Sequence, residues 1–273
     1  MRLLIAISGL PNSELVVRLA SHMAGRAGET PTVLTVIRGL QDRRGAKSAL
    51  ERARAMLENE VSSVNTKIRA GHPAEEIIRE AEEGDYDLII VGDRQHRDLA
   101  RFVLGSTAER VMEHAPCPVL IAKGRVHPIR HVLLCASGAQ SPSLLDRFST
   151  QLAEMVGGGV EITVLHVMSQ MSAGPGVRGK QLRAEAEDLV REHTPEGEML
   201  AVDVHILEEL NLSPYAKVRH GLVVDEILEE ARTGDYQLVV IGASRGEGWQ
   251  RILLDDLARR IISQVDRPIL VVR

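Results

Sequence analysis

The sequence predicts an α/β protein built from two tandem copies of one Rossmann-like domain, each with an open parallel sheet covered by helices on both faces. Three observations predict this. The chain has 273 residues, about twice the usual length of one domain. Its C-terminal half repeats its N-terminal half. Apolar residues make up 44% of the chain but aromatic residues only 2%, so aliphatic side chains must fill the cores, as in sheets buried on both faces.

The repeat has a single register: each residue of 71–123 aligns with the residue 150 positions later, without a gap. The matched pairs include Gly71 and Gly221, Glu76 and Glu226, Glu80 and Glu230, Tyr86 and Tyr236, Gly92 and Gly242, and Pro118 and Pro268. Earlier in the chain, Ile7-Ser8-Gly9 matches Ala136-Ser137-Gly138. A duplication explains so many matches in one register. We therefore predict a first domain at 1–124 (unit one) and a second at 129–273 (unit two).

Strands and helices alternate within each unit. In unit one, apolar runs typical of buried strands are Leu3–Ile7, Thr32–Ile37, Val64–Arg69, Leu88–Gly92 and Val119–Ala122. Helical patterns lie between them, and one of these begins with Pro73, which suits the first turn of a helix. Such alternation implies crossover helices and a parallel sheet, whose ligand crevice lies at the carboxyl ends of the strands.

Unit two departs from unit one at about 195–213, where the sequence has an insertion. Val202, Val204 and Ile206 alternate with other residues, which is the period of a strand. We interpret the segment as an extra edge strand or hairpin, and the alternative is a longer loop packed on its own domain. An edge strand would offer a docking edge to a partner, because unpaired strands are templates for pairing.

Composition excludes several classes of function. The net charge is −5 and no stretch is both basic and aromatic, so the sequence does not favour binding to nucleic acid. No apolar run approaches the roughly 18–20 residues of a membrane span. The two cysteines, Cys117 and Cys135, form no disulfide framework or metal-binding motif. The apolar start of the chain breaks at Ser8-Gly9, which suits a strand better than a signal peptide, and we expect a cytoplasmic protein.

The segment most typical of a binding site follows the fourth predicted strand of unit one. It begins Gly92-Asp93-Arg94-Gln95 and, nine residues later, reaches Gly105-Ser106-Thr107 and a helix. The free N–H groups and the positive dipole at a helix N-terminus favour an anion. Gly105 would allow close approach of a phosphate, and the hydroxyls of Ser106 and Thr107 could donate to its oxygens. The alternative is an ordinary helix cap that binds nothing.

This pattern is similar to the Gly-x2-Gly-x9-Gly-Ser loop of the universal stress protein family. The resemblance extends to Gly71-x-Pro73, to 86–92, to 104–111 and to 115–120, and it covers essentially the whole chain as a tandem pair. It implies five-stranded parallel sheets of order 3-2-1-4-5. It also implies adenine-nucleotide binding in members that keep the loop, and pairing of domains through their last strands.

The resemblance assigns site residues in unit one only. Gly92, Gly105 and Ser106, with Thr107 beside them, would hold the phosphates of ATP or AMP, and magnesium would accompany ATP. Val36 is at the position that contacts adenine, and Ser8 replaces the acid that holds the ribose. Gln95 replaces the second glycine of the loop. A charged hydrogen bond is stronger than a neutral one, so the loss of the acid alone would weaken binding by something like tenfold.

Unit two has lost the phosphate site. Asp255-Asp256 stands where unit one has Gly105-Ser106, Arg245 replaces the second glycine, and Ser137 again replaces the acid. Aspartate suits a helix start but repels phosphate, at a cost of about 1 kcal/mol in water and about 4 kcal/mol at an effective dielectric constant of roughly 20. We therefore expect unit two to be a structural or regulatory copy.

Three functions compete. The first is a non-catalytic stress-response regulator that binds an adenine nucleotide weakly in unit one. The second is an interaction module with both sites inactive. The third is a weak ATPase, which would need an acid near the phosphates, and Asp93 and Asp98 are the candidates in the loop. The resemblance also predicts a homodimer, an unidentified protein partner, and an intramolecular pseudo-dimer in which Val119–Ala122 lies antiparallel to Ile269–Val272.

Overall fold

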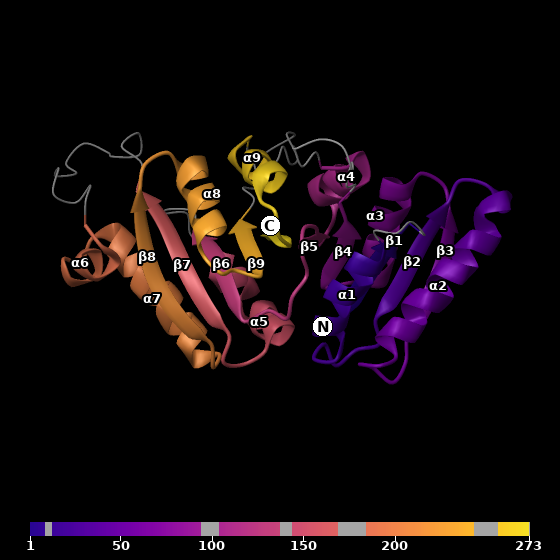
Figure 1. The fold of residues 1–273 in the computed structure, drawn as a ribbon. Coiled ribbons are helices and arrows are strands. Elements are labelled where there is room, and N and C mark those ends of the chain that lie inside the picture. The colour runs from indigo at the N-terminus through magenta and orange to yellow at the C-terminus, as the bar shows by residue number, and fades with distance from the viewer. Residues whose placement is uncertain (9–12, 94–103, 137–143, 169–183, 243–255, 273) are drawn as a thin grey trace.

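The computed structural model describes residues 1–8, 13–93, 104–136, 144–168, 184–242 and 256–272. It contains two halves of the same design, side by side (Figure 1). The elements of unit one are, in chain order, β1 (Leu3–Ile7), α1 (Ser13–Ala24), β2 (Thr32–Ile37), the short 3-10 helix η1 (Leu40–Asp42), α2 (Arg43–Leu57), β3 (Asn65–Ala70), α3 (Pro73–Gly84), β4 (Leu88–Gly92), α4 (Ser106–His114) and β5 (Val119–Ala122). The strands and helices alternate as predicted.

Unit two follows the same order, except that a short α-helix stands where unit one has the 3-10 helix η1. Its elements are β6 (His131–Ala136), α5 (Leu144–Val156), β7 (Glu161–Met168), α6 (Ala186–Arg191), α7 (Pro195–Glu209), β8 (Ser213–His220), α8 (Val223–Thr233), β9 (Leu238–Gly242), α9 (Asp256–Gln264) and β10 (Ile269–Val272). Helix α9 begins 150 positions after α4, so the register of the sequence repeat is also the register of the two folds.

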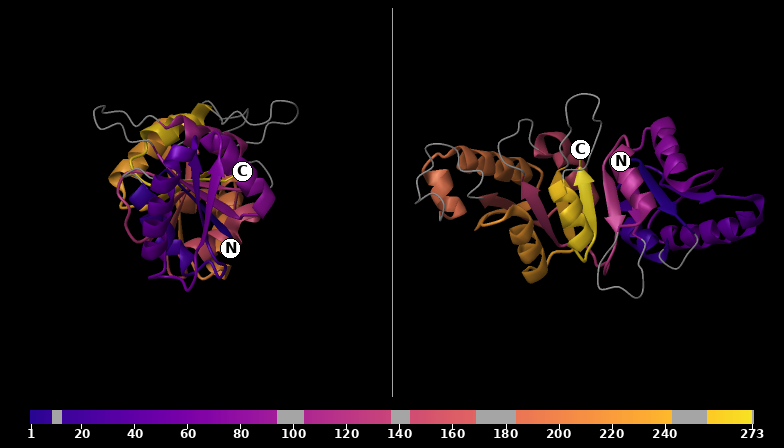
Figure 2. Two further views of the ribbon diagram at one scale, coloured as in Figure 1. Left: turned by 90° about the vertical axis from the view of Figure 1, so that its right-hand side faces the viewer. Right: turned by 90° about the horizontal axis from the view of Figure 1, so that it is seen from above.

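The strands form one continuous sheet of ten strands in the order β3-β2-β1-β4-β5-β10-β9-β6-β7-β8. Each half has the predicted order and its strands are parallel. The two halves join where β5 and β10 pair antiparallel, with Leu120 opposite Leu270 (Figure 2). This confirms the predicted pairing of the last strands. It corrects the expectation of two separate five-stranded sheets, because the shared edge merges them.

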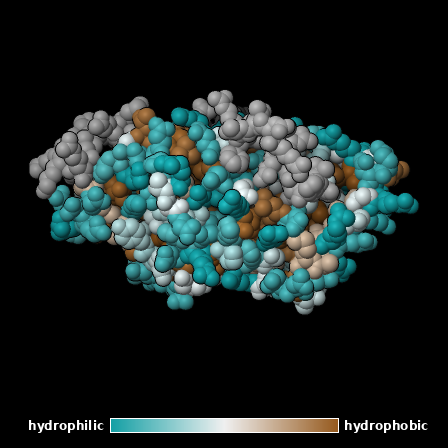
Figure 3. Space-filling model, in the orientation of Figure 1, coloured by the Kyte–Doolittle hydropathy of each residue, from teal (hydrophilic) through white to brown (hydrophobic). Residues whose placement is uncertain are grey.

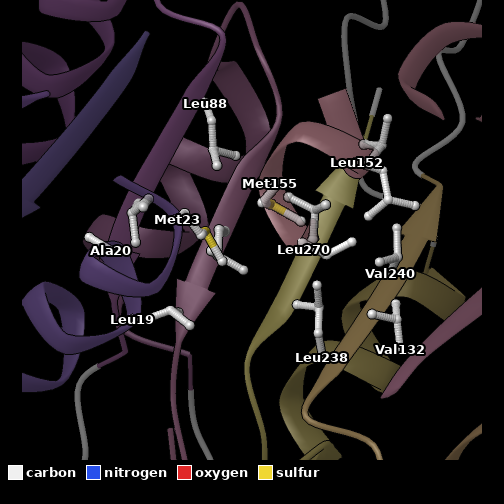
Figure 4. Close-up of a cluster of buried hydrophobic side chains, with 14 of the residues drawn as sticks. Leu19, Ala20, Met23, Leu88, Val132, Leu152, Met155, Leu238, Val240 and Leu270 are labelled. Atoms are coloured by element: carbon white, nitrogen blue, oxygen red, sulfur yellow. The ribbon is translucent and has the colours of Figure 1, made fainter. Parts of the chain in front are cut away.

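Helices cover both faces of the sheet. On one face, α1, α2, α5 and α7 bury an apolar cluster that runs across both units without a break. Met23 of α1, Met155 of α5 and Leu270 of β10 lie in this cluster (Figure 4). On the other face, α3, α4, α8 and α9 bury a second cluster that also contains residues of both units. The two units therefore share their cores as well as their sheet.

Polar contacts complete the junction between the units. Arg259 of α9 donates to Glu109 of α4 at 3.0 Å and also forms an ion pair with Glu113. Gly124, which follows the last strand of unit one, has φ of +62°, and a Cβ there would lie 1.7 Å from the carbonyl oxygen of Asp266. Only glycine fits this position without moving the backbone.

The insertion in unit two is not an edge strand, and that prediction was wrong. Residues 195–209 form helix α7, which is the crossover between β7 and β8. Its buried face consists of Gly197, Leu200, Asp203 and Leu207, which have helical spacing. Thr194 caps it by accepting a hydrogen bond from the N–H of Gly197. The additional chain precedes α7: the connection from β2 to α2 spans 38–42, whereas that from β7 to α7 spans 169–194.

A buried ion-pair network explains several matches of the repeat. In unit one, Glu80 of α3 is 2% exposed. It accepts hydrogen bonds from Lys67 and Arg69 of β3 and from the hydroxyl of Tyr86. Unit two repeats the arrangement with Lys217, Arg219, Glu230 and Tyr236 at the matching positions. In each unit the network fastens an edge strand to the helix that covers it, so the duplicated residues have a structural role.

The face in Figure 3 is mostly hydrophilic, with apolar atoms in small separate groups. Within the part of the chain that the structure describes, no helix combines the length and the apolarity that crossing a membrane would require.

Candidate functional site

The strand order predicts where a ligand would bind in unit one. From β1 the chain winds outward through β2 and β3 on one side, while β4 and β5 lie on the other. The order therefore reverses between β1 and β4, and ligands of open parallel sheets bind at such a point, outside the carboxyl ends of the strands. Ser8 directly follows β1, and Gly92 is the last residue of β4. Both predicted residues therefore lie at this point of the sheet edge.

Helix α4 brings the remaining predicted loop residues to the same edge of the sheet. Gly105 precedes the helix, and Ser106 and Thr107 are its first two residues. The Gly105 N–H donates to Asp93 Oδ1 at 3.1 Å, and this bond holds the start of the helix beside the end of β4. Ser106 is exposed, whereas Gly105 and Thr107 are half-buried. The N-terminus of α4 thus lies beside the end of β4, and its first residue, Ser106, is exposed.

The two residues assigned to the nucleoside also lie at the carboxyl ends of their strands. Ser8 is exposed, and its N–H donates to Ser13 Oγ of α1 at 3.3 Å. Val36 is the penultimate residue of β2, is half-buried, and packs against the cluster under α3 and α4. All six predicted site residues therefore lie at one edge of unit one. Their contacts with a ligand stay a prediction.

Sequence reasoning did not assign the partnership of Asp93 with Lys123. Asp93 is 4% exposed and Lys123 is 1% exposed. They directly follow the neighbouring strands β4 and β5, and the Asp93 N–H donates to the Ala122 carbonyl at 3.1 Å. Burial lowers the pKa of the Lys123 ammonium to about 8, while the negative charges of Asp93 and Asp266 act in the opposite direction. Polar residues directly after two adjacent parallel strands were the signal for this pair.

Lys123 also connects this edge to unit two. Its Nζ donates to the carbonyl oxygen of Ile262 at 2.6 Å. Ile262 lies in the last turn of α9, where carbonyl groups lack partners within the helix. A positive charge at a helix C-terminus is favourable because of the helix dipole. The lysine that interacts electrostatically with Asp93 at the end of β4 thus also caps a helix of unit two.

The corresponding edge of unit two is chemically different. Gly242 ends β9 and α9 starts at Asp256, so an acidic residue begins the helix where unit one has Ser106. Val167 of β7 corresponds to Val36, and its neighbour His166 is 6% exposed. The Nδ1 atom of His166 is buried and has no hydrogen-bond partner. Burial lowers the pKa of His166, so its ring is neutral at neutral pH.

Several predicted residues lie outside the described part of the chain. In unit one these are Gln95 and Asp98, and in unit two they are Ser137, Arg245 and Asp255. Across the residues that are described, no group of three or more histidine, cysteine, aspartate or glutamate side chains is arranged to hold a metal ion.

Comparisons with known proteins agree with this architecture. The sequence profile of the universal stress protein family matches residues 1–123 and again residues 128–273. A universal stress protein of Mycolicibacterium smegmatis is 27% identical over 261 residues, which cover 89% of this chain and 81% of that protein. Universal stress protein MJ0531 of Methanocaldococcus jannaschii is 40% identical over 77 residues. That alignment covers 28% of this chain and 45%, less than half, of the relative.

Solved structures show the same fold over the full length. A universal stress protein from Archaeoglobus fulgidus superposes with a TM-score of 0.70 at 19% identity, covering 100% of this chain and 96% of that one. Protein PA1789 from Pseudomonas aeruginosa, described as functionally unknown, gives a TM-score of 0.72 at 18% identity and covers 99% of this chain. The duplicated sequence, the ten-stranded sheet and the family match over both halves lead to one conclusion. The chain belongs to the universal stress protein family and carries two of its domains in tandem.

Proposed function

We propose that this protein is a non-catalytic stress-response regulator that binds an adenine nucleotide, ATP or AMP, weakly and in unit one only. The observation that carries the proposal is the position of Gly105, Ser106 and Thr107 at the start of α4, directly beside the end of β4. N–H groups and a hydroxyl at such a helix end suit a phosphate. Val36 and Ser8 lie along the same edge, where the nucleoside would bind. Magnesium would accompany ATP.

The direct test is to denature the purified protein, identify any released nucleotide by mass spectrometry, and titrate the stripped protein with ATP and AMP by calorimetry. The proposal expects adenine nucleotide in the released fraction or saturable binding of one molecule per chain. Absence of both would reject nucleotide binding.

Gly105→Asp is expected to weaken nucleotide binding by at least about tenfold, because it places a carboxylate where the phosphate must come. The measurement is the rise in the thermal unfolding midpoint at saturating ATP. Gly105→Asn is the matched control, since asparagine has the size of aspartate without its charge, and it should keep more of the shift. A full shift in the Gly105→Asp variant would contradict the site in unit one.

Asp255→Gly combined with Asp256→Ser is expected to create a second site, because the change gives unit two the Gly-Ser pair of unit one. Calorimetry should then show two nucleotides per chain in place of one. The single change Asp256→Ser serves as a control that leaves one carboxylate in place. A stoichiometry that stays at one would contradict the view that the two aspartates alone close unit two.

One observation favours the alternative function, an interaction module with both sites inactive. The carboxylate of Asp93 already accepts a hydrogen bond from Gly105, as a bound anion would. If no adenine compound binds, this alternative becomes the better proposal. We also propose a homodimer. Because β5 and β10 pair with each other, a second copy would have to bind through another surface.

A further inference from the structure

The N–H of Gly105 is already occupied by the protein itself. Residues at the start of a helix have N–H groups without partners inside the helix, and a phosphate bound there takes these donors. Here Asp93 Oδ1 accepts from the Gly105 N–H at 3.1 Å. A carboxylate of the chain therefore stands where a phosphate oxygen would accept a hydrogen bond.

Asp93 is held firmly in this place. Its side chain is 4% exposed, and its own N–H is bonded to the carbonyl of Ala122 on the neighbouring strand. The adjacent Lys123 is buried, and its ammonium is fixed by the carbonyl of Ile262 at 2.6 Å. The negative charge of Asp93 favours the charged form of Lys123. Rotation of the carboxylate away from α4 would break its hydrogen bond with the Gly105 N–H and change its electrostatic interaction with the buried Lys123 ammonium.

We propose that Asp93 determines the ligand class of unit one: it selects adenine compounds with little phosphate charge, adenosine or AMP, against ATP. The proposal rests on the proposed function, since it concerns the same site. Each phosphate charge that approaches α4 is repelled by the carboxylate and competes with it for the Gly105 N–H. The penalty grows with the number of phosphate charges, and a neutral nucleoside avoids it.

Asp93→Asn isolates this charge. The amide oxygen of asparagine can still accept from Gly105, so the local hydrogen bond is kept while the negative charge is removed. We expect ATP to bind about tenfold more tightly to this variant than to the wild type, AMP to gain about threefold, and adenosine to be unchanged. The measurement is calorimetric titration with the three ligands at one ionic strength, without divalent cations.

Asp87→Asn is the matched control. Asp87 directly precedes β4, at the opposite end of the same strand, and its Oδ2 also accepts a backbone N–H, that of Arg2, at 2.6 Å. The change in net charge is the same, but the carboxylate lies at the other edge of the sheet. This variant should bind all three ligands as the wild type does. Asp93→Ser, which also removes the charge, replaces Asp93→Asn if the asparagine variant does not fold.

The outcomes separate this inference from the proposed function. The inference is supported if Asp93→Asn gains affinity, if the gain increases from adenosine to ATP, and if Asp87→Asn shows no such gain. An equal gain in affinity for all three ligands, or no gain for ATP, overturns the inference. Nucleotide binding by the wild type is not affected by that result. If neither the wild type nor an Asp93 variant binds any of the three compounds, both proposals fail. If the Asp93 variants bind ATP and the wild type binds none of the three compounds, the inference holds. The proposed nucleotide binding by the wild type is then rejected.

Discussion

Glu80→Gln is expected to lower the free energy of unfolding by about 3 kcal/mol, because it removes the central charge of a buried ion-pair network. Glu80 accepts hydrogen bonds from Lys67 at 2.5 Å, Arg69 at 2.7 Å and the Tyr86 hydroxyl at 3.0 Å. Glutamine cannot balance the two cations, and its amide places hydrogens where acceptors are needed. Urea unfolding followed by circular dichroism would measure the change.

The same variant should show a characteristic dependence on pH. Burial raises the pKa of Glu80, but the hydrogen bonds from Lys67, Arg69 and Tyr86 outweigh it and hold the pKa below its ordinary value. The stabilisation is therefore complete above the unfolded pKa, about 4.3, and is lost as the pH falls through the folded pKa. The gap between wild type and Glu80→Gln should be constant near neutral pH and should narrow below about pH 4.

Glu83→Gln is the control for this network. Glu83 also forms an ion pair with Arg69, at 2.8 Å, but its side chain is 56% exposed. Exposed pairs contribute little because water screens them, so the change in stability should be much smaller than for Glu80→Gln. Equal losses of stability in Glu80→Gln and Glu83→Gln would show that burial of the Glu80 carboxylate does not account for its contribution.

Leu120→Ala and Leu270→Ala are each expected to destabilise the protein by about 2–5 kcal/mol, the usual cost of truncating a fully buried leucine. Both side chains are 0% exposed, and they face each other across the pairing of β5 with β10. Because this pairing joins the units into one sheet, either change should lower the stability of both units together. Hydrogen exchange of the backbone amides of β6, β7 and β9 during urea unfolding can follow unit two alone.

The informative variant is therefore Leu120→Ala, which lies in unit one. Its urea midpoint should fall for amide exchange of unit two as well as for circular dichroism of the whole chain. Leu40→Ala is the matched control, since Leu40 is 79% exposed and its truncation should change stability by no more than about 0.5 kcal/mol. If Leu120→Ala leaves the amide-exchange transition of unit two unchanged, the two units unfold independently and the shared sheet does not couple them.

The fold could be predicted from the sequence where a local pattern was strong. Apolar runs separated by helical patterns indicated the strands, and the repeat indicated the duplication. The pairing of the last strands followed from the family resemblance. Helix α7 was missed because Val202, Val204 and Ile206 alternate as in a strand, while its buried face carries Gly197 and Asp203 in place of apolar residues. Thr194-Pro195 was the overlooked signal, since threonine caps helices and proline suits their first turn.

Part of the candidate site could be predicted from the sequence, and part could not. Gly105, Ser106 and Thr107 are consecutive in the sequence, so the local pattern alone placed them at a helix N-terminus. The partnership of Asp93 with Lys123 depends on two strands that are adjacent in space and distant in sequence. The requirement for glycine at position 124 could not be predicted either, because it arises from the carbonyl group of Asp266 in the other unit. Contacts across the junction are set by tertiary packing and leave no local pattern in the sequence.

Arg259 and Glu109 occupy matching places in the two units and meet each other in the structure. When two identical subunits associate about a two-fold axis, a residue near that axis meets its own copy, so any charge there meets a like charge. Joining both subunits in one polypeptide removes this symmetry constraint. The residue at this position could become acidic in one copy and basic in the other. Opposite charges could then meet where identical subunits would bring like charges together. Fusion thus let each half evolve as a specific partner for the other.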